Sequence, residues 1–384
     1  MTAVKQTAHA PPAKSAETLA QRAASLAQDF AARSADHDRD GSYVAENIEK
    51  LKAAGLTIAA VPAELGGGDA GLTDMCDAVR LIAKGCSSTG LAFAMHCHQV
   101  VIPAWRWRNQ PATRPVLEPL LRRIAAERLM MLTSGGGDWI GGSGRAERVE
   151  GGWRVHAKKP FVSGASTGNI LMTSAVSDEG ILHFGLPMNA GGVTVRDNWD
   201  TLGMRGTGSF QVEMDGFFLA DDKVALKRKA GEWHPLFQII ATLAFPLIYS
   251  AYLGVAEKAR DSALALAQKR SGAARLPGMI GAMETDLRAA QMALRHMIDA
   301  ATGMAPGAES VNEVMIGRQL VERHVLRTVE LAMEVAGGAG FYRSTGLEQC
   351  FRDIQAARYH PMRRDAQALY CGSMALGDPV ATIY

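Results

Sequence analysis

The sequence predicts an α+β protein in which a helical domain, a central β-domain and a second helical bundle follow one another along the chain. Three zones of hydrophobic periodicity carry this prediction. Apolar residues recur every three or four positions up to about Arg128, alternate from Leu129 to about Leu226, and return to helical spacing after Glu232. A Rossmann fold would alternate strands with helices and place a glycine-rich turn after its first strand, so this order excludes it.

The same zones give the expected domain boundaries. Residues 1–15 combine Ala, Pro and polar residues without the apolar segment of a secretory signal, so we expect a disordered leader. The N-terminal helical domain is expected over 16–128, the β-domain over 129–226 and the C-terminal bundle over 232–384. A turn at Glu150, Gly151 and Gly152 is typical of a hairpin and favours antiparallel strands.

Composition narrows the class of partner. The 384 residues are enough to bury a large core, and 41 Lys and Arg against 39 Asp and Glu leave a net charge of only +2. This balance excludes nucleic acid as the main partner and favours a small-molecule substrate. The five cysteines form an odd set without metal-binding spacing, so we expect no metal site and a reducing, cytoplasmic location.

One stretch is long enough to cross a bilayer. Residues 233–256 contain no Asp, Glu, Lys or Arg. Polar residues and Pro246 interrupt the stretch, and no second span accompanies it. We therefore expect no membrane insertion, and a helix buried on all sides in a bundle or a subunit interface.

Two short segments have the composition of a cofactor site. Thr133 to Gly144 is the most glycine-dense segment, and such a loop lets the backbone approach a flat or anionic ligand. Phe161, Val162 and Ser163 then offer an aromatic wall beside a hydroxyl, which are groups that a flavin ring needs. The alternatives are an ordinary interdomain turn and an ordinary strand end.

Together these segments resemble the acyl-CoA dehydrogenase superfamily of FAD enzymes, from about Ala16 to Gly377. The motifs occur in the family's order: Leu132-Thr133 with the glycine run, Phe161–Gly164, Leu202–Gly206, Tyr252–Ala256, Gly337–Phe341 and Phe351–Asp353. The resemblance implies a barrel-like antiparallel β-domain, a C-terminal four-helix bundle, bound FAD and a homotetramer.

The resemblance also implies roles for individual residues. Thr133 and Ser163 would contact the flavin edge, Phe161 would cover one face of the ring, and Arg270 would reach the pyrophosphate of a cofactor in a neighbouring subunit. The remaining cofactor-binding positions implied by the matched motifs are Ser134, Gly135, Gly136, Val162, Gly337 and Gly338.

The sequence departs from the family at the catalytic base. The family's glutamate is missing from the loop between Arg358 and Asp365, and its place falls on His360 or Pro361 according to the alignment. An alternative base position, on the first C-terminal helix, falls near Ala244, where there is no carboxylate. A histidine with an ordinary pKa near 6.5 exchanges protons at neutral pH, so His360 is the candidate base, with a helix-capping role as the alternative.

Two further histidines, His96 and His98, are candidates for substrate contact, although satisfied core histidines are the commoner case. On a helix they diverge and cannot chelate one metal ion.

Three functions fit these residues. The leading one is an FAD-dependent oxidoreductase acting on the CH–CH group of an acyl thioester such as an acyl-CoA, with His360 as base and a separate electron-transfer partner. The second is a two-component monooxygenase that takes reduced flavin, FAD or FMN, from a flavin reductase. The third is a non-catalytic flavin-binding or assembly protein.

Overall fold

The computed structural model describes residues 17–134, 136–137, 139–269 and 275–384. The predicted leader, Gly135 and Arg270 lie outside these residues. The N-terminal helices are α1 (Leu19–Asp40), α2 (Ala45–Ala53), α3 (Leu72–Gly85), α4 (Ser87–Asn109) and α5 (Arg114–Glu127). The C-terminal helices are α6 (Pro235–Gln268), α7 (Leu276–Gly303), α8 (Ala308–Ala336), α9 (Leu347–Ile354) and α10 (Arg364–Leu376).

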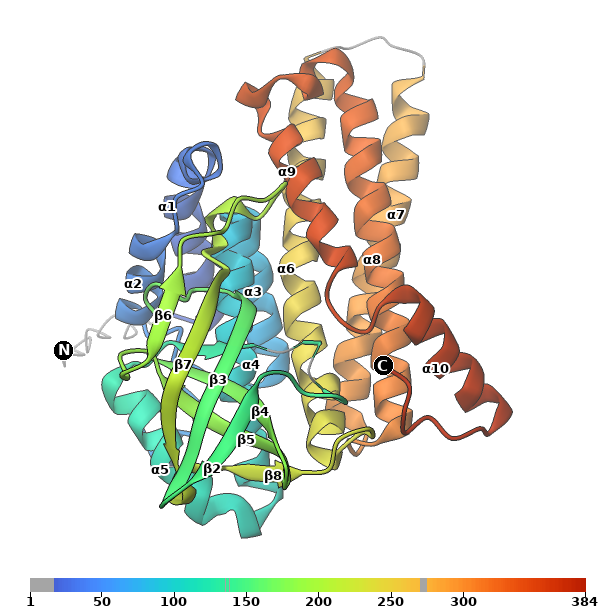
Figure 1. Cartoon of the computed structure of the whole chain (residues 1–384). Helices are drawn as coiled ribbons and strands as arrows, with labels where there is room; N and C mark the ends of the chain where they lie inside the picture. The colour runs from blue at the N-terminus through green and yellow to red at the C-terminus, as the bar shows by residue number, and fades with distance from the viewer. Residues whose placement is uncertain (1–16, 135, 138, 270–274) are drawn as a thin grey trace, which may run out of the picture.

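The predicted fold class is confirmed, since the strands lie between the two groups of helices in the sequence and beside both in space (Figure 1). The strands are β1 (Met131–Thr133), β2 (Arg145–Val149), β3 (Gly152–Val162), β4 (Ile170–Ser177), β5 (Gly180–Pro187), β6 (Val193–Arg196), β7 (Phe210–Ala220) and β8 (Leu226–Arg228). They form one sheet in the order β6-β7-β3-β2-β4-β5-β8, with β1 also paired to β4.

Most of the sheet is antiparallel, as predicted. The expected hairpin joins β2 to β3, with Val149 opposite Gly152 and Gly151 at a φ of 72°, which a glycine adopts without strain. The expectation of an antiparallel sheet fails at two pairings, because β1 and β2 both run parallel to β4. The chain between β1 and β2 is the glycine run, which carries it onward instead of reversing it in a hairpin.

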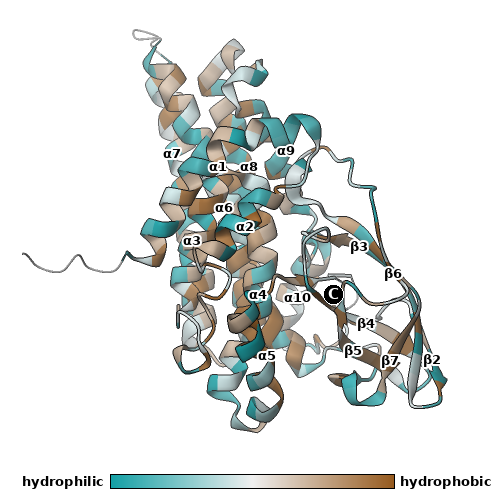
Figure 2. Ribbon diagram, turned by 90° about the vertical axis from the view of Figure 1, so that its left-hand side faces the viewer, coloured by the Kyte–Doolittle hydropathy of each residue, from teal (hydrophilic) through white to brown (hydrophobic). Residues whose placement is uncertain are grey.

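Most of the uncharged stretch lies in α6, where other helices of the same chain bury it. α6 is long and apolar enough to cross a membrane, but 94% of its most apolar window is buried inside the protein. It packs against α3 and α4 on one side and α7 and α8 on the other, and Figure 2 shows its hydrophobic residues among the other helices. This stretch therefore does not need a neighbouring subunit to bury it, which corrects one argument for oligomerisation.

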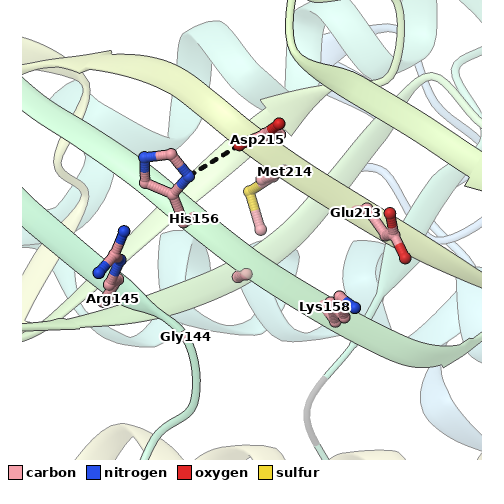
Figure 3. Close-up of a pocket in the computed structure, with 8 residues that line it drawn as sticks. Gly144, Arg145, His156, Lys158, Glu213, Met214 and Asp215 are labelled. Carbon is pink, nitrogen blue, oxygen red and sulfur yellow. Dashed lines mark hydrogen bonds and ion pairs between the residues drawn. The ribbon is translucent and has the colours of Figure 1, made fainter.

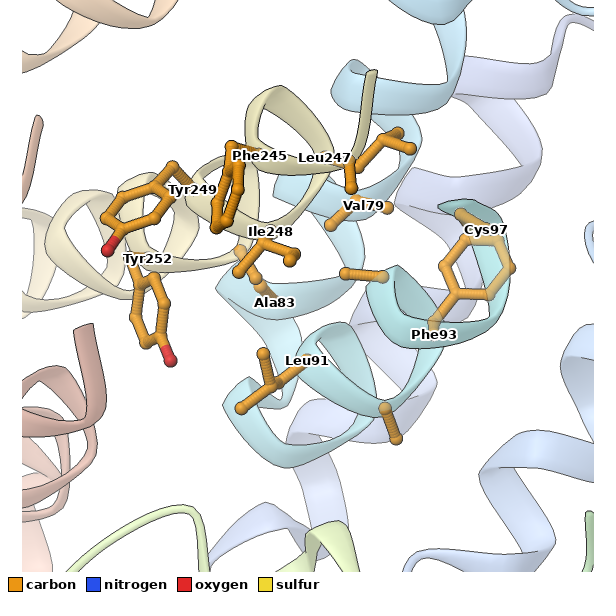
Figure 4. Packing of buried hydrophobic residues seen from close by; sticks show 14 of the residues in the cluster. Val79, Ala83, Leu91, Phe93, Cys97, Phe245, Leu247, Ile248, Tyr249 and Tyr252 are labelled. Atoms are coloured by element: carbon orange, nitrogen blue, oxygen red, sulfur yellow. The ribbon is translucent and has the colours of Figure 1, made fainter. Parts of the chain in front are cut away.

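Close packing of small and aromatic residues joins the two helical groups. Figure 4 shows this contact, in which Phe245, Leu247 and Ile248 of α6 meet residues from α3 and α4. The residues from these two helices are Val79, Ala83, Leu91, Phe93 and Cys97, all of them buried. Burial of each of the larger side chains, such as Leu, Ile or Phe, stabilises the fold by about 1.5–3 kcal/mol.

The three parts of the chain meet at one buried carboxylate. Asp353 of α9 accepts hydrogen bonds from the Ser87 hydroxyl at the start of α4 and, at 2.5 Å, from the Met204 N–H of the β-domain. Gly203 approaches so closely that a Cβ would lie 2.3 Å from the Arg352 carbonyl oxygen. The Phe351–Asp353 motif therefore fixes how the domains sit against one another.

Candidate functional site

His360 lies in the segment between α9 and α10, facing α6 and α8. Its Nε2 lies 2.6 Å from the hydroxyl of Tyr252 on α6, and its backbone carbonyl accepts a hydrogen bond of 2.6 Å from Arg318 on α8. The imidazole thus bonds to a side chain on another element, which differs from the helix cap considered as the alternative. On the next residue, the Pro361 ring lies against Gly136 of the glycine run, where a Cβ would be 3.2 Å away.

The environment of His360 favours its neutral form. Burial, the charge of Arg318 and the nearby His98 ring together lower the pKa of His360 to about 3. Burial also raises the pKa of Tyr252 well above its ordinary value. Both groups are therefore uncharged around pH 7, and the ordinary histidine pKa assumed from the sequence does not apply here.

The first cofactor segment is fixed to the sheet at its start. Thr133 ends β1 opposite Met172 of β4. The Ser134 N–H donates to the Met172 carbonyl at 3.3 Å, and the Ser134 and Thr173 hydroxyls are 2.8 Å apart. Ser134 is thus hydrogen-bonded to the sheet, and Gly136 lies against Pro361, the neighbour of His360.

Phe161 has the geometry of an exposed aromatic platform. Its φ is 60°, a region that non-glycine residues avoid at a cost of about 1–3 kcal/mol, and a bulge interrupts the β3–β7 register between Lys159 and Val162. The ring is 68% exposed and packs edge-on against Trp199 at 6.0 Å between centroids. Phe161 therefore does not belong to the core, and the strained backbone presents its ring at the surface.

Ser163 is the first of several linked hydroxyls. Its oxygen lies 2.8 Å from that of Ser209, which lies 2.8 Å from that of Thr207. At the next residue, a Cβ on Gly164 would lie 3.5 Å from Leu132, so this turn packs beside the end of β1. The two cofactor segments predicted from the sequence are therefore neighbours in space.

His96 has a structural position. Its Nδ1 accepts from the Met131 N–H at 2.9 Å, which leaves Nε2 to donate to the Thr57 carbonyl at 2.8 Å. Both ring nitrogens are occupied by backbone groups and the residue is 1% exposed, so no polar atom remains for a substrate. This corrects the expectation of substrate contact: His96 anchors β1 to the helical domain.

His98 is placed differently. Its Nδ1 lies 3.2 Å from the Ala94 carbonyl one turn earlier, and its ring is close enough to His360 to lower the pKa of that residue. Burial lowers the pKa of His98 itself to about 4. His98 thus remains a candidate for contact with a ligand beside His360.

Other predicted positions are not brought to this site. Val162 is fully buried, so its side chain belongs to the core. Gly337 and Gly338 follow α8 at the end of the bundle remote from the β-domain (Figure 1). Trp199, Arg318 and the Tyr252 hydroxyl could not be predicted from the sequence, because each reaches the site through a contact distant in the chain.

An open groove of about 580 Å³ lies over β3 and β7, apart from His360 (Figure 3). Its polar residues include His156, which contacts Asp215 at 2.9 Å, and Glu213, which pairs with Arg196 at 2.6 Å. None of the predicted site residues lines it. Among the residues that the structure describes, no group of three or more His, Cys, Asp or Glu is arranged to hold a metal ion.

The residues of the site fit a flavin. Phe161 offers an exposed aromatic face backed by the half-buried Trp199, Ser163 offers a hydroxyl nearby, and the glycine run lets the backbone come close. No carboxylate contacts the His360 imidazole among the described residues. Such a combination of apolar faces with few polar groups is what a flavin-dependent oxidoreductase requires of its cofactor site.

Comparison with known proteins establishes the family. Residues 14–123 match the family model for the acyl-CoA dehydrogenase N-terminal domain and residues 246–360 the model for the C-terminal domain. The chain belongs to the acyl-CoA dehydrogenase superfamily.

Similar proteins of this superfamily carry out other reactions. The amino sugar nitrososynthase DnmZ of Streptomyces peucetius is 28% identical over 90% of this chain and 90% of its own. A dibenzothiophene monooxygenase of Mycolicibacterium goodii is 26% identical over 85% of this chain and 86% of its own. The structure of KijD3 with FMN and a dTDP-amino-keto sugar superposes with a TM-score of 0.85 and 25% identity, covering 97% and 96% of the two chains.

The strained backbone of Phe161 gives a test of the flavin face. In Phe161→Gly the unfavourable φ is relieved, so we expect the flavin-free protein to be as stable as the parent or more stable by up to about 1 kcal/mol. Flavin affinity should fall at least about 10-fold, because the aromatic contact is lost. Thermal unfolding and flavin titration measure the two effects, with Phe161→Leu as the control that keeps Cβ. Unchanged flavin affinity in both variants would remove Phe161 from the site.

Proposed function

We propose that this protein is a monooxygenase that uses reduced flavin and O₂ to oxygenate a nitrogen or sulfur atom of a small molecule. A separate reductase would supply the reduced flavin. Of the functions considered from the sequence, this proposal takes the two-component monooxygenase and not acyl-CoA oxidation. The observation that supports the proposal is the uncharged His360–Tyr252 pair.

Acyl-CoA oxidation requires a base strong enough to remove a proton from carbon. A histidine whose pKa is about 3 is a weaker base than an ordinary carboxylate or histidine, and catalytic efficiency falls as the pKa departs from the working pH. The alternative base position is no better, since Ala244 is a buried alanine on α6. Proton abstraction from carbon is therefore poorly supported.

Oxygenation requires a different environment. A reduced flavin, when bound, would supply the two electrons that O₂ needs for oxygenation. A neutral tyrosine and a neutral histidine can hold a polar oxygen by hydrogen bonds without introducing a charge, and their 2.6 Å contact fixes the position of the Tyr252 hydroxyl. The low exposure of His98 and Tyr252 limits water at this point.

The relatives support the class of substrate. A nitrososynthase forms a nitroso group from an amine and a dibenzothiophene monooxygenase acts on a sulfur heterocycle, so both names refer to heteroatom substrates. We propose an amine as the first substrate class to test, because the more similar of these two relatives acts on amino sugars.

The function is tested by supplying chemically reduced FMN or FAD with O₂ and a panel of amines, including a dTDP-amino sugar, and of sulfur heterocycles. We expect a product that carries ¹⁸O from ¹⁸O₂, formed only when reduced flavin is present. Acyl-CoAs under anaerobic conditions serve as the contrasting panel. Bleaching of bound oxidised flavin by an acyl-CoA, with no oxygenated product from any amine or sulfur compound, would overturn the proposal in favour of a dehydrogenase.

A further inference from the structure

The segment that carries His360 is held by side chains of α6 and α8. It comprises residues 357–364, which run from the short helical turn after α9 to the first residue of α10. The Tyr249 hydroxyl of α6 donates to the Ala357 carbonyl at 2.8 Å, and Arg318 of α8 donates to the His360 carbonyl at 2.6 Å. Figure 4 shows Tyr249 and Tyr252 on neighbouring turns of α6, so the helix that binds the imidazole also binds the backbone of the segment.

Arg318 belongs to a fully buried ion pair. Its partner is Glu322, one turn later on α8, and both side chains have an exposed fraction of 0%. The guanidinium also lies over the Tyr249 ring at 5.1 Å. Moving two charges out of water carries a penalty that their attraction often fails to repay, so an apolar pair of similar volume is commonly as stable. Stability alone therefore does not account for this pair.

The other contacts of the pair point to a different role. Besides its contact with His360, Arg318 reaches the Ala357 carbonyl at 3.4 Å. Glu322 accepts from both Nε and Nη2 of Arg364, at 2.7 and 2.6 Å, where α10 begins. One end of the segment thus binds the cation and the other end binds the anion of the same buried pair.

We propose that Arg318 and Glu322 are positioning residues that hold the 357–364 segment so that the His360 imidazole meets Tyr252. The catalytic meaning of this placement rests on the proposed function, whereas the positioning itself does not. The pair acts through the backbone, because Arg318 contacts the His360 carbonyl and not the ring.

The charged groups around the imidazole determine how the pKa of His360 would change if Arg318 and Glu322 were removed. Charged and titratable neighbours come from every element around it: His98 of α4, Tyr249 and Tyr252 of α6, Arg318 and Glu322 of α8, and Arg358, Arg363 and Arg364 of the segment and α10. Arg318 is the cation that opposes protonation of His360. Its removal, together with looser packing, should let His360 take up a proton at higher pH.

The test is the double variant Arg318→Met/Glu322→Leu in the full chain, which removes both buried charges together. We expect it to fold and to bind flavin within about 3-fold of the parent, because an apolar pair can replace a buried ion pair. Backbone amides of 357–364 should exchange with deuterium at least about 10-fold faster than in the parent. Exchange at the imidazole Cε1, followed by mass spectrometry against pH, should show the pKa of His360 moving up toward the ordinary value of about 6.5.

A matched control removes an ion pair elsewhere. Arg80 of α3 and Glu257 of α6 are 2.8 Å apart and join these two helices, with no hydrogen bond to residues 357–364. The variant Arg80→Met/Glu257→Leu should therefore leave the exchange of 357–364 unchanged. If the Arg318/Glu322 double variant does not fold, Arg318→Lys retains the charge with fewer donors and should give a smaller increase in exchange. Parental exchange and an unmoved His360 pKa in whichever variant folds would overturn the proposal.

The oxygenation assay separates this proposal from the proposed function. If the exchange changes appear but the parent protein oxygenates nothing, the positioning role stands and the proposed function fails. If the parent is an active monooxygenase and the variant keeps both parental exchange and parental rate, the positioning role fails alone. Where both hold, the variant should lose oxygenation rate at low pH first, since protonated His360 no longer accepts from Tyr252.

Discussion

Replacing His360 with alanine should lower the rate of substrate oxygenation by about 2- to 10-fold, because the Tyr252 hydroxyl loses the hydrogen-bond partner that positions it. The variant removes the imidazole whose Nε2 lies 2.6 Å from the Tyr252 hydroxyl. Flavin affinity should change little, because Phe161 and Ser163 lie on other elements. Single-turnover rates with reduced flavin and the flavin dissociation constant are the two measurements.

Two controls make this result specific. Tyr252→Phe keeps the aromatic packing and removes only the hydroxyl, so it should lose part of the same rate. His360→Gln keeps an acceptor for the Tyr252 hydroxyl without the ability to titrate, and should fall between the parent and alanine. A parental rate in His360→Ala would leave His360 with a packing role only.

The pH profile of the parent separates the structure from the sequence-based expectation. An ordinary histidine would give a rate that rises through pH 6.5, whereas the lowered pKa of about 3 keeps His360 neutral throughout pH 5–9. We therefore expect no inflection from His360 in this range.

The sequence was sufficient for features that depend on local pattern. The order of helical and strand zones, the hairpin at Gly151 and the burial of residues 233–256 all follow from periodicity and turn chemistry. The chemistry of the site was less accessible, because Tyr252 and His360 are separated by 108 positions and no spacing rule relates them. The two buried charges of α8 also occupy positions at which a periodic pattern predicts apolar residues.

The histidines illustrate the same limit. The three- and four-residue spacing of apolar residues around His96 and His98 placed both on one helix, and the structure assigns them different partners. Only the fold reveals that β1 supplies the N–H that His96 accepts, because Met131 and His96 belong to different domains. The sequence motifs therefore predicted where the site lies better than they predicted what each residue in it does.

Acid should destabilise this protein strongly, because His96 and His98 are buried as neutral rings. Burial lowers the pKa of each to about 4, compared with about 6.5 in an unfolded chain. Between these values the unfolded state binds more protons than the folded state, so the free energy of unfolding falls as the pH falls below 6.5 and is unaffected by these groups above it. The loss at pH 4 is about 3 kcal/mol for each histidine, a large part of the 5–15 kcal/mol typical of a folded domain.

Urea unfolding at pH 7, 5.5 and 4.5 measures this loss of stability. His96→Gln is the informative variant, because a glutamine oxygen can accept from the Met131 N–H and its amide can donate to the Thr57 carbonyl without titrating. It should be less stable than the parent at pH 7, where the original packing is lost, and should lose less stability on acidification. Equal slopes with pH in the two proteins would show that His96 is not one of the groups that take up a proton on unfolding.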